Sequence, residues 1–247
     1  MLKCSDSADD RLYFGSGRMR HEQAIRHVAR QPPVAELERP LPLQNLPPLP
    51  EELQKTLSKA QDLYRWIAEQ QDNIEIPTQR TSLVPGLLFD LTIEHHAGIV
   101  HLALARMNGP AFALLRAAME ALVRGAWLQR CATPEEVEAF VAKETLPLVF
   151  GGLVEAVEAH ADFSDKLLSR LKHSSWKAMN SYTHGGMFQL GRRIKGDIIE
   201  PNFDPEEVVE VLKASGTFAL LALRQIAHLA MHDALSKKVD EMLDGGK

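Results

Sequence analysis

Apolar residues recur every three or four positions over most of the chain after residue 50, whereas no useful length shows the period of two expected of a half-buried strand. This pattern predicts helices over residues 51–73, from Thr81 or Ser82 to Met107, and over 111–130. Further helices are expected to begin near residues 134 and 165, one is expected to end at Gly185, and the last is expected to span 205–234. The sequence therefore predicts an all-α protein of six to eight helices, packed as an up-and-down bundle.

Short local motifs support several of these helix ends. Thr133-Pro134-Glu135-Glu136 and Asp204-Pro205-Glu206-Glu207 each place a capping residue before a proline at the first helical position and an acid at the third. Asn108-Gly109-Pro110 is expected to end one helix, form a turn and begin the next helix. The helices on its two sides are therefore expected to lie antiparallel.

The N-terminal fifth of the chain has a different composition. Seven of the 14 prolines lie between Pro32 and Pro50, and proline fixes φ and lacks an amide donor. We interpret residues 1–49 as an irregular Pro-rich arm and residues 50–247 as the helical bundle domain. No apolar run typical of a secretory signal is found in the first thirty residues, and only two cysteines are present, so a cytoplasmic protein is expected. Charged residues interrupt the apolar stretches 112–128 and 218–231, so no membrane span is predicted.

Two stripes of charged residues lie on the apolar helices beside the Asn108-Gly109 turn. Arg116, Glu120 and Arg124 are spaced by four, and the preceding helix carries a second set on one face: Asp90, Glu94 and His101. Counting from the turn, Glu94 is expected opposite Arg124 and His101 opposite Arg116. Two interpretations stay open, a buried ion network that fixes the register of the helices and a pocket for a small ligand.

Metal and cofactor sites are not expected. The Glu-x-x-His pairs of carboxylate-bridged metal bundles do not occur, and no glycine-rich loop for phosphate is present. His228 and His232 are spaced by four, but no acidic partner stands at a suitable offset.

Charge is distributed unevenly along the chain. The formal net charge is −5, from 28 basic and 33 acidic residues. Seven basic residues and no acid fall between residues 166 and 196, namely Lys166, Arg170, Lys172, Lys177, Arg192, Arg193 and Lys195. Aromatic and histidine side chains are interleaved with them, a mixture suited to phosphate contacts and base stacking. Arg170, Lys172, Arg192, Arg193 and Lys195 are therefore candidates for RNA binding, and a solvated basic helix face is the alternative.

The stretch from Trp176 to Gly185 carries the most specific pattern. Lys177 and His184 are seven residues apart and share one face of a helix that Gly185 is expected to end. Lys177, six residues, His184 and Gly185 resemble the motif of the HEPN superfamily, which has Arg, four to six residues and His, often followed by Gly. Residues 50–235 also resemble a family of bacterial helical proteins related to that superfamily, through the stretches 113–124 and 176–185. In this chain a lysine stands where the motif has arginine, which keeps the charge but lacks the planar fork.

The resemblance implies a function as well as a HEPN-like helical bundle. Ribonuclease members of the superfamily cleave RNA without metal, commonly as dimers and in toxin–antitoxin or phage-defence systems. By this resemblance His184 is the general acid or base, Lys177 stabilises phosphate charge, and Asn180 and Tyr182 position the backbone. A homodimer, an RNA ligand and a cognate protein partner are the expected partners. A bundle that only binds a protein, or one that binds a small ligand, remains the alternative.

Overall fold

The computed structural model describes residues 26–27, 48–72, 74–163, 165–195 and 198–245, and it is an all-α helical bundle, which confirms the predicted fold class. Nearly all of the predicted Pro-rich arm lies outside the described residues. The elements follow in the order β1 (Arg26–His27), α1 (Glu51–Gln71), β2 (Glu75–Ile76), α2 (Arg80–Leu104), α3 (Asn108–Arg130), α4 (Pro134–Lys143), α5 (Phe150–Val157), a 3₁₀ turn η2 (Ala161–Phe163), α6 (Leu167–Thr183), α7 (Met187–Gly191), β3 (Ile194–Lys195), β4 (Ile198–Ile199), α8 (Pro205–Leu229) and α9 (Asp233–Gly245).

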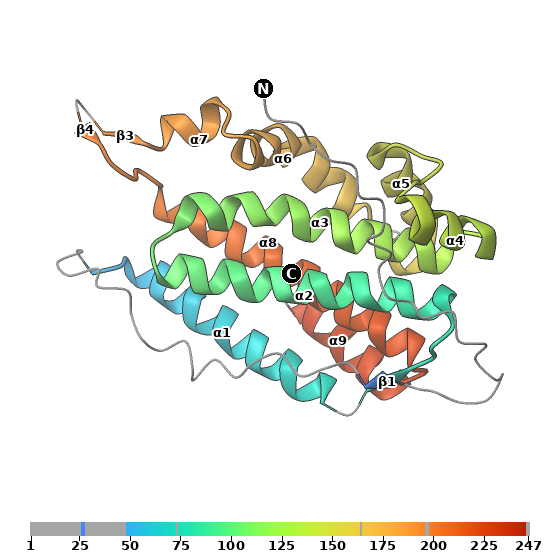
Figure 1. Cartoon of the computed structure of the whole chain (residues 1–247). Helices are drawn as coiled ribbons and strands as arrows, with labels where there is room; N and C mark the ends of the chain where they lie inside the picture. Colours follow the sequence, from blue (N-terminus) through green and yellow to red (C-terminus); the bar gives the residue numbers. More distant parts are fainter. Residues whose placement is uncertain (1–25, 28–47, 73, 164, 196–197, 246–247) are drawn as a thin grey trace, which may run out of the picture.

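The long helices α2, α3 and α8 form the centre of the bundle. α2 packs along both α3 and α8, α1 and α9 cover α8, and α6 lies on the opposite side against α3 (Figure 1). Fully buried side chains from the three central helices, such as Phe89, Leu122 and Phe218, fill the core between them. Because α3 lies between the core and α6, one of its sides packs against α2 and α8 and the other faces α6. The candidate site lies on the side that faces α6.

Within the described residues, the strands are two-residue segments in two small antiparallel pairs. β1 pairs with β2, with Arg26 opposite Ile76, and β3 pairs with β4, with Ile194 opposite Ile199. They therefore do not change the all-α class.

Two predicted helix ends are wrong by a few residues. α2 ends at Leu104 because Arg106 takes a left-handed φ of 56° and Met107 N–H donates to the Leu102 carbonyl at 2.7 Å. Asn108 and Gly109 consequently form the first turn of α3 rather than a separate turn. α2 begins at Arg80, so neither Thr81 nor Ser82 is its cap.

The predicted last helix is in fact two helices. α8 ends at Leu229, Met231 has φ of 52°, and α9 begins at Asp233. His232 Nδ1 accepts a hydrogen bond from Leu235 N–H at 3.2 Å, so this imidazole caps the start of α9. The capping box predicted at Thr133 is confirmed, since Thr133 and Glu136 exchange side-chain and backbone hydrogen bonds.

A candidate phosphate-binding site between α3 and α6

Aromatic and backbone contacts fix α6 against the first half of α3. The Phe112 ring meets the buried Tyr182 ring edge-on with centroids 5.0 Å apart, and Thr183 Oγ1 donates to the Ala113 carbonyl at 3.4 Å. Met179 is buried on the same side of α6. The C-terminal end of α6 therefore has a defined position over α3.

A left-handed glycine ends α6, as the sequence predicts. Gly185 has φ of 65°, and Gly186 N–H donates to the Ser181 carbonyl at 2.7 Å. This turn leaves His184 as the capping residue, with its side chain exposed at the end of the helix.

The imidazole of His184 meets the charged stripe of α3. Its Nε2 lies 2.8 Å from Arg116 Nη1. Arg116 Nε donates to one oxygen of Glu120 at 2.7 Å, and Arg124 Nη2 donates to the other at 2.8 Å. A guanidinium only donates, so in a hydrogen bond with Arg116 the acceptor is His184 Nε2. We refer to Arg116, Glu120, Arg124, His184 and the neighbouring Trp176 as the α3–α6 site.

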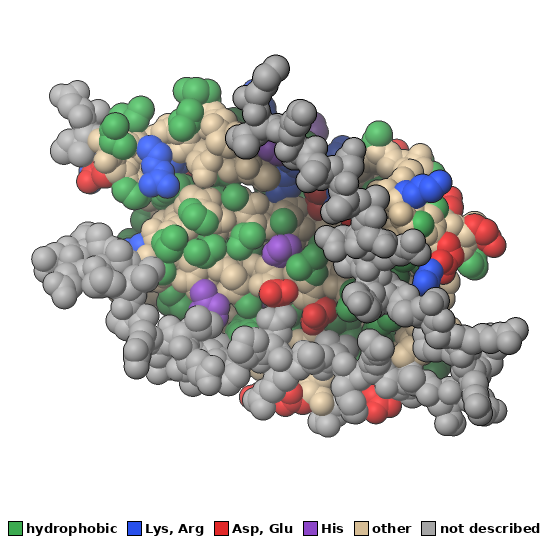
Figure 2. All heavy atoms as spheres, in the orientation of Figure 1, with side chains coloured by type: hydrophobic (Ala, Val, Ile, Leu, Met, Phe, Trp, Pro, Cys, Tyr) green, Lys and Arg blue, Asp and Glu red, His purple; other side chains and the backbone are tan. Residues whose placement is uncertain are grey.

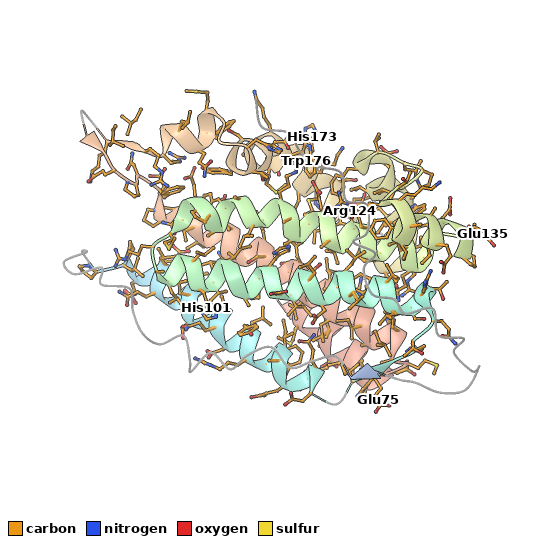
Figure 3. The ribbon with its side chains drawn as sticks, in the orientation of Figure 1. Glu75, His101, Arg124, Glu135, His173 and Trp176 are labelled. Atoms are coloured by element: carbon orange, nitrogen blue, oxygen red, sulfur yellow. The ribbon has the colours of Figure 1, made fainter. Side chains whose placement is uncertain are left out.

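Trp176 closes one side of this site. The guanidinium carbon of Arg116 lies 5.0 Å from the centre of the Trp176 ring, a cation–π distance. The Trp176 ring is also stacked on the ring of Phe150 in α5, with centroids 4.5 Å apart and planes 11° apart. Figure 3 shows Trp176 on α6 and Arg124 on α3 on the two sides of the space between these helices.

The predicted pairing of charges across the α2–α3 turn is wrong. Asp90 accepts a hydrogen bond from Gln71 of α1 at 3.3 Å, and His101 lies edge-on to Tyr64 of α1 at 6.3 Å. Glu94 is exposed, and among the described residues it has no hydrogen bond or ion pair. The stripe of α2 therefore faces α1, whereas the stripe of α3 faces α6, because the apolar sides of both helices fill the core between them.

Burial shifts the pKa values of the groups on the α2 stripe. It raises the pKa of the Asp90 carboxyl, which the hydrogen bond from Gln71 opposes, and it lowers the pKa of the His101 imidazole. Both groups are separated from the α3–α6 site by the core, so the six predicted network residues divide into two sets of three.

The four predicted catalytic residues do not converge. Lys177 is exposed, and within the described ranges no hydrogen bond or ion pair engages it. The side-chain oxygen of Asn180 is buried without a hydrogen-bond partner among those ranges. Tyr182 packs in the core, and burial raises the pKa of its phenol, while a hydrogen bond with Arg192 opposes that rise. Of the four, only His184 belongs to the α3–α6 site, and it is joined there by Arg116, which the sequence placed in another cluster.

Most of the predicted RNA-binding residues are engaged elsewhere. Arg192 pairs with Glu207 and lies 3.7 Å from Asp204, and Lys195 lies 3.1 Å from Glu200. Arg170 donates to the Asp165 carbonyl while remaining exposed. Arg193 is exposed near the end of α7, and Lys172 lines a small cavity beside Trp176. Acids from outside the segment thus compensate part of its charge, and its basic residues do not form one continuous track.

A second polar cluster lies at the far end of α3. His228 Nε2 is 2.8 Å from Ser236 Oγ, and its Nδ1 is 3.5 Å from an Asp162 oxygen, which is the order of a serine–histidine–aspartate triad. However, Arg130 Nη2 lies 2.5 Å from the same Nδ1 and donates to it. Nε2 must then carry the proton and donate to Ser236, so His228 has no free lone pair with which to activate the serine.

The one described cysteine is also unsuited to nucleophilic chemistry. Cys131 Sγ lies 3.5 Å from His160 Nε2, but burial raises the pKa of the thiol, which Arg130 only partly opposes. Across the described part of the chain, no three His, Cys, Asp or Glu side chains are grouped to hold a metal ion. Within the same residues, no helix has the length and apolar character needed to cross a membrane.

The fold and the site define a helical bundle in which a partly buried arginine–carboxylate cluster between two helices meets an exposed histidine. The chain belongs to a family of unknown function, DUF6988, whose model matches residues 89–245. The matched region contains every residue of the α3–α6 site. No curated protein and no solved structure matches the chain.

Proposed function

We propose that this protein binds RNA at the α3–α6 site and cleaves it without a metal ion, with Arg116 and His184 acting on the scissile phosphate. The observation that carries the proposal is the 2.8 Å contact between Arg116 Nη1 and His184 Nε2 at an exposed helix end. A guanidinium can hold two phosphate oxygens at once, and an imidazole exchanges a proton near neutral pH. These are the two chemical roles that cleavage through a ribose 2′-hydroxyl requires.

In this proposal Arg116 replaces Lys177 as the phosphate-binding residue. The spacing Lys177 to His184 suggested a HEPN-like motif with a lysine in place of arginine. Arg116 supplies the planar fork from a different helix, and Glu120 holds it in position from behind. Arg124, held by the same carboxylate, provides a second positive charge on the same side.

The proposed reaction starts from the neutral His184. An RNA phosphate takes over the Arg116 N–H that now points at Nε2, which frees the Nε2 lone pair. Nε2 then removes the proton of the 2′-hydroxyl, the 2′-oxygen attacks phosphorus, and the bond to the 5′-oxygen breaks. The products are a 2′,3′-cyclic phosphate and a 5′-hydroxyl that takes its proton from solvent. Arg116 and Arg124 stabilise the extra negative charge of the transition state.

The experiment is cleavage of an end-labelled RNA in EDTA by purified variants. We expect His184→Ala and Arg116→Lys to lower the rate by about 100-fold or more, because each removes a group that acts in the transition state. The matched controls are His173→Ala, which removes another exposed histidine of α6, and Lys177→Ala, which removes the motif lysine. Both controls should keep the rate within about threefold.

Full activity of His184→Ala would refute the catalytic assignment. Loss of activity in Lys177→Ala with retention in Arg116→Lys would return the role to the motif lysine. An RNA with a 2′-deoxy group at the cleaved position should still bind but remain intact. Binding without cleavage of any RNA would leave a binding module, and the absence of binding would refute the whole proposal.

A further inference from the structure

A cavity of about 620 Å³ opens beside the α3–α6 site, between α2, α4 and α5. Its walls are mainly apolar and include Leu83, Leu87, Phe140 and Leu148. The volume falls in the range that accommodates a small organic group. Leu87 is 54% exposed although it is a large apolar side chain, so the cavity presents apolar surface to water.

The cavity and the α3–α6 site share one side chain, Arg124, and a second, Phe150, connects the cavity wall to the site. Arg124 lines the cavity and also donates to Glu120. Phe150 forms part of the cavity wall, and its ring is stacked on Trp176, which in turn lies under the Arg116 guanidinium. An apolar recess therefore adjoins the cationic groups, and a ligand with an anion attached to an apolar ring could occupy both at once.

Figure 2 shows that hydrophobic side chains reach the surface along α2 and α3, and that acidic, basic and histidine side chains gather where α6 meets α3. Arg124 borders the recess on the side of the α3–α6 site, and two further charged residues, Arg80 and Glu144, line it elsewhere. A ligand that places its anion on Arg116 and Arg124 would place its apolar part against the leucine and phenylalanine side chains of the recess.

We infer, on the basis of the proposed RNA function, that the cavity receives one unstacked nucleobase of single-stranded RNA while the attached phosphate lies on Arg116 and Arg124. Two phenylalanine rings and aliphatic walls suit the faces of a base, and the positive charges at the edge suit its phosphate. A base in a duplex could enter only after losing its pairing partner. The substrate class is therefore single-stranded RNA, which the cavity recognises through one unstacked base.

The test is binding of a labelled nine-nucleotide RNA, measured by fluorescence anisotropy in EDTA with the His184→Ala variant as the parent, so that the RNA stays intact. In this background Leu87→Trp fills the cavity from an exposed position. Leu91→Trp is the matched control, because Leu91 lies one turn further along α2, is 37% exposed and does not line the cavity. We expect Leu87→Trp to weaken binding about tenfold and Leu91→Trp to change it by less than about twofold.

A second measurement uses the same parent and changes the RNA instead of the protein, and it is then repeated in the Leu87→Trp variant. Each nucleotide of the RNA is replaced in turn by an abasic one. One position should lose about tenfold in affinity, and this loss should disappear in the Leu87→Trp variant, because the base and the introduced ring compete for one space. A duplex of the same sequence should bind at least tenfold more weakly than the single strand.

The outcomes separate the inference from the proposed function. RNA binding that is unaffected by Leu87→Trp and by every abasic replacement would overturn the base pocket and leave the phosphate site intact. Equal affinity for duplex and single strand would also overturn it. If neither the parent nor the unaltered protein binds RNA, the proposed function itself fails.

Discussion

Glu120→Gln tests the centre of the α3–α6 site, because one carboxylate holds both arginines. The side chain of Glu120 is 16% exposed, that of Arg116 is 21% exposed and that of Arg124 is 42% exposed. A hydrogen bond to a charged, largely buried group contributes about 1.5 kcal/mol to the free energy of unfolding, which we assign to the Arg116 bond. An exposed ion pair contributes about 0.5 kcal/mol, which we assign to Arg124 because solvent screens it.

The sum predicts that Glu120→Gln lowers the free energy of unfolding by about 2 kcal/mol, since the amide accepts more weakly and leaves two neighbouring cations uncompensated. The assay is urea denaturation at pH 7 followed by circular dichroism at 222 nm, with an unchanged slope against urea as the check that the denatured state is the same. This loss of unfolding free energy should be smaller at high salt, because salt screens the repulsion between the two arginines.

Glu94→Gln is the control, because residue counting from the turn pairs Glu94 with Arg124, whereas Glu94 is exposed and makes no such pair. It should change the free energy of unfolding by less than about 0.5 kcal/mol. A loss in Glu94→Gln equal to that in Glu120→Gln would refute the assignment of the α3 stripe to α6 and favour the pairing across the turn.

Two further predictions concern the core. Burial lowers the pKa of His96 to about 4, so as pH falls below 6.5 the unfolded chain takes up a proton before the folded protein does. The free energy of unfolding should therefore drop by about 2 kcal/mol between pH 7 and pH 5. Urea denaturation at both pH values should show a smaller drop in His96→Gln, and an equal drop would refute the assignment. Gly125→Ala should lower the free energy of unfolding by about 1–3 kcal/mol, because the added carbon would lie 2.8 Å from the Phe89 ring across the α2–α3 contact. Gly191→Ala, where the added carbon meets nothing within 4 Å, is its control in the same denaturation assay, and a similar loss in both variants would contradict the close α2–α3 approach.

The helices could be predicted from the sequence because their signals are local. The spacing of apolar residues, the Thr133 capping box and the left-handed Gly185 each act within one or two turns, and the structure has all three. Errors arose where a side chain took an uncommon local role. His232 caps α9 through its ring, and the left-handed Met231 ends the preceding turn, although neither residue type is a usual punctuation signal.

The candidate site was predicted only in parts. Arg116, Glu120, Arg124 and His184 were all selected from the sequence, but they were placed in two unrelated clusters. Counting residues from a turn gives the register of two helices but not the rotation of each about its axis. That rotation depends on which sides the core buries, and this directs Asp90 toward α1 and Arg116 toward α6.

The sequence by itself determined the helical class, most helix boundaries and the residues able to carry charge chemistry, because these depend on neighbours within a few positions. Only the tertiary structure decided that Arg116, rather than Lys177, meets His184, and that Glu207, Asp204 and Glu200 compensate part of the basic segment. The contact between Arg116 and His184 joins positions 68 residues apart. Such a pair forms only after the burial of apolar faces has oriented both helices, so no local pattern records it.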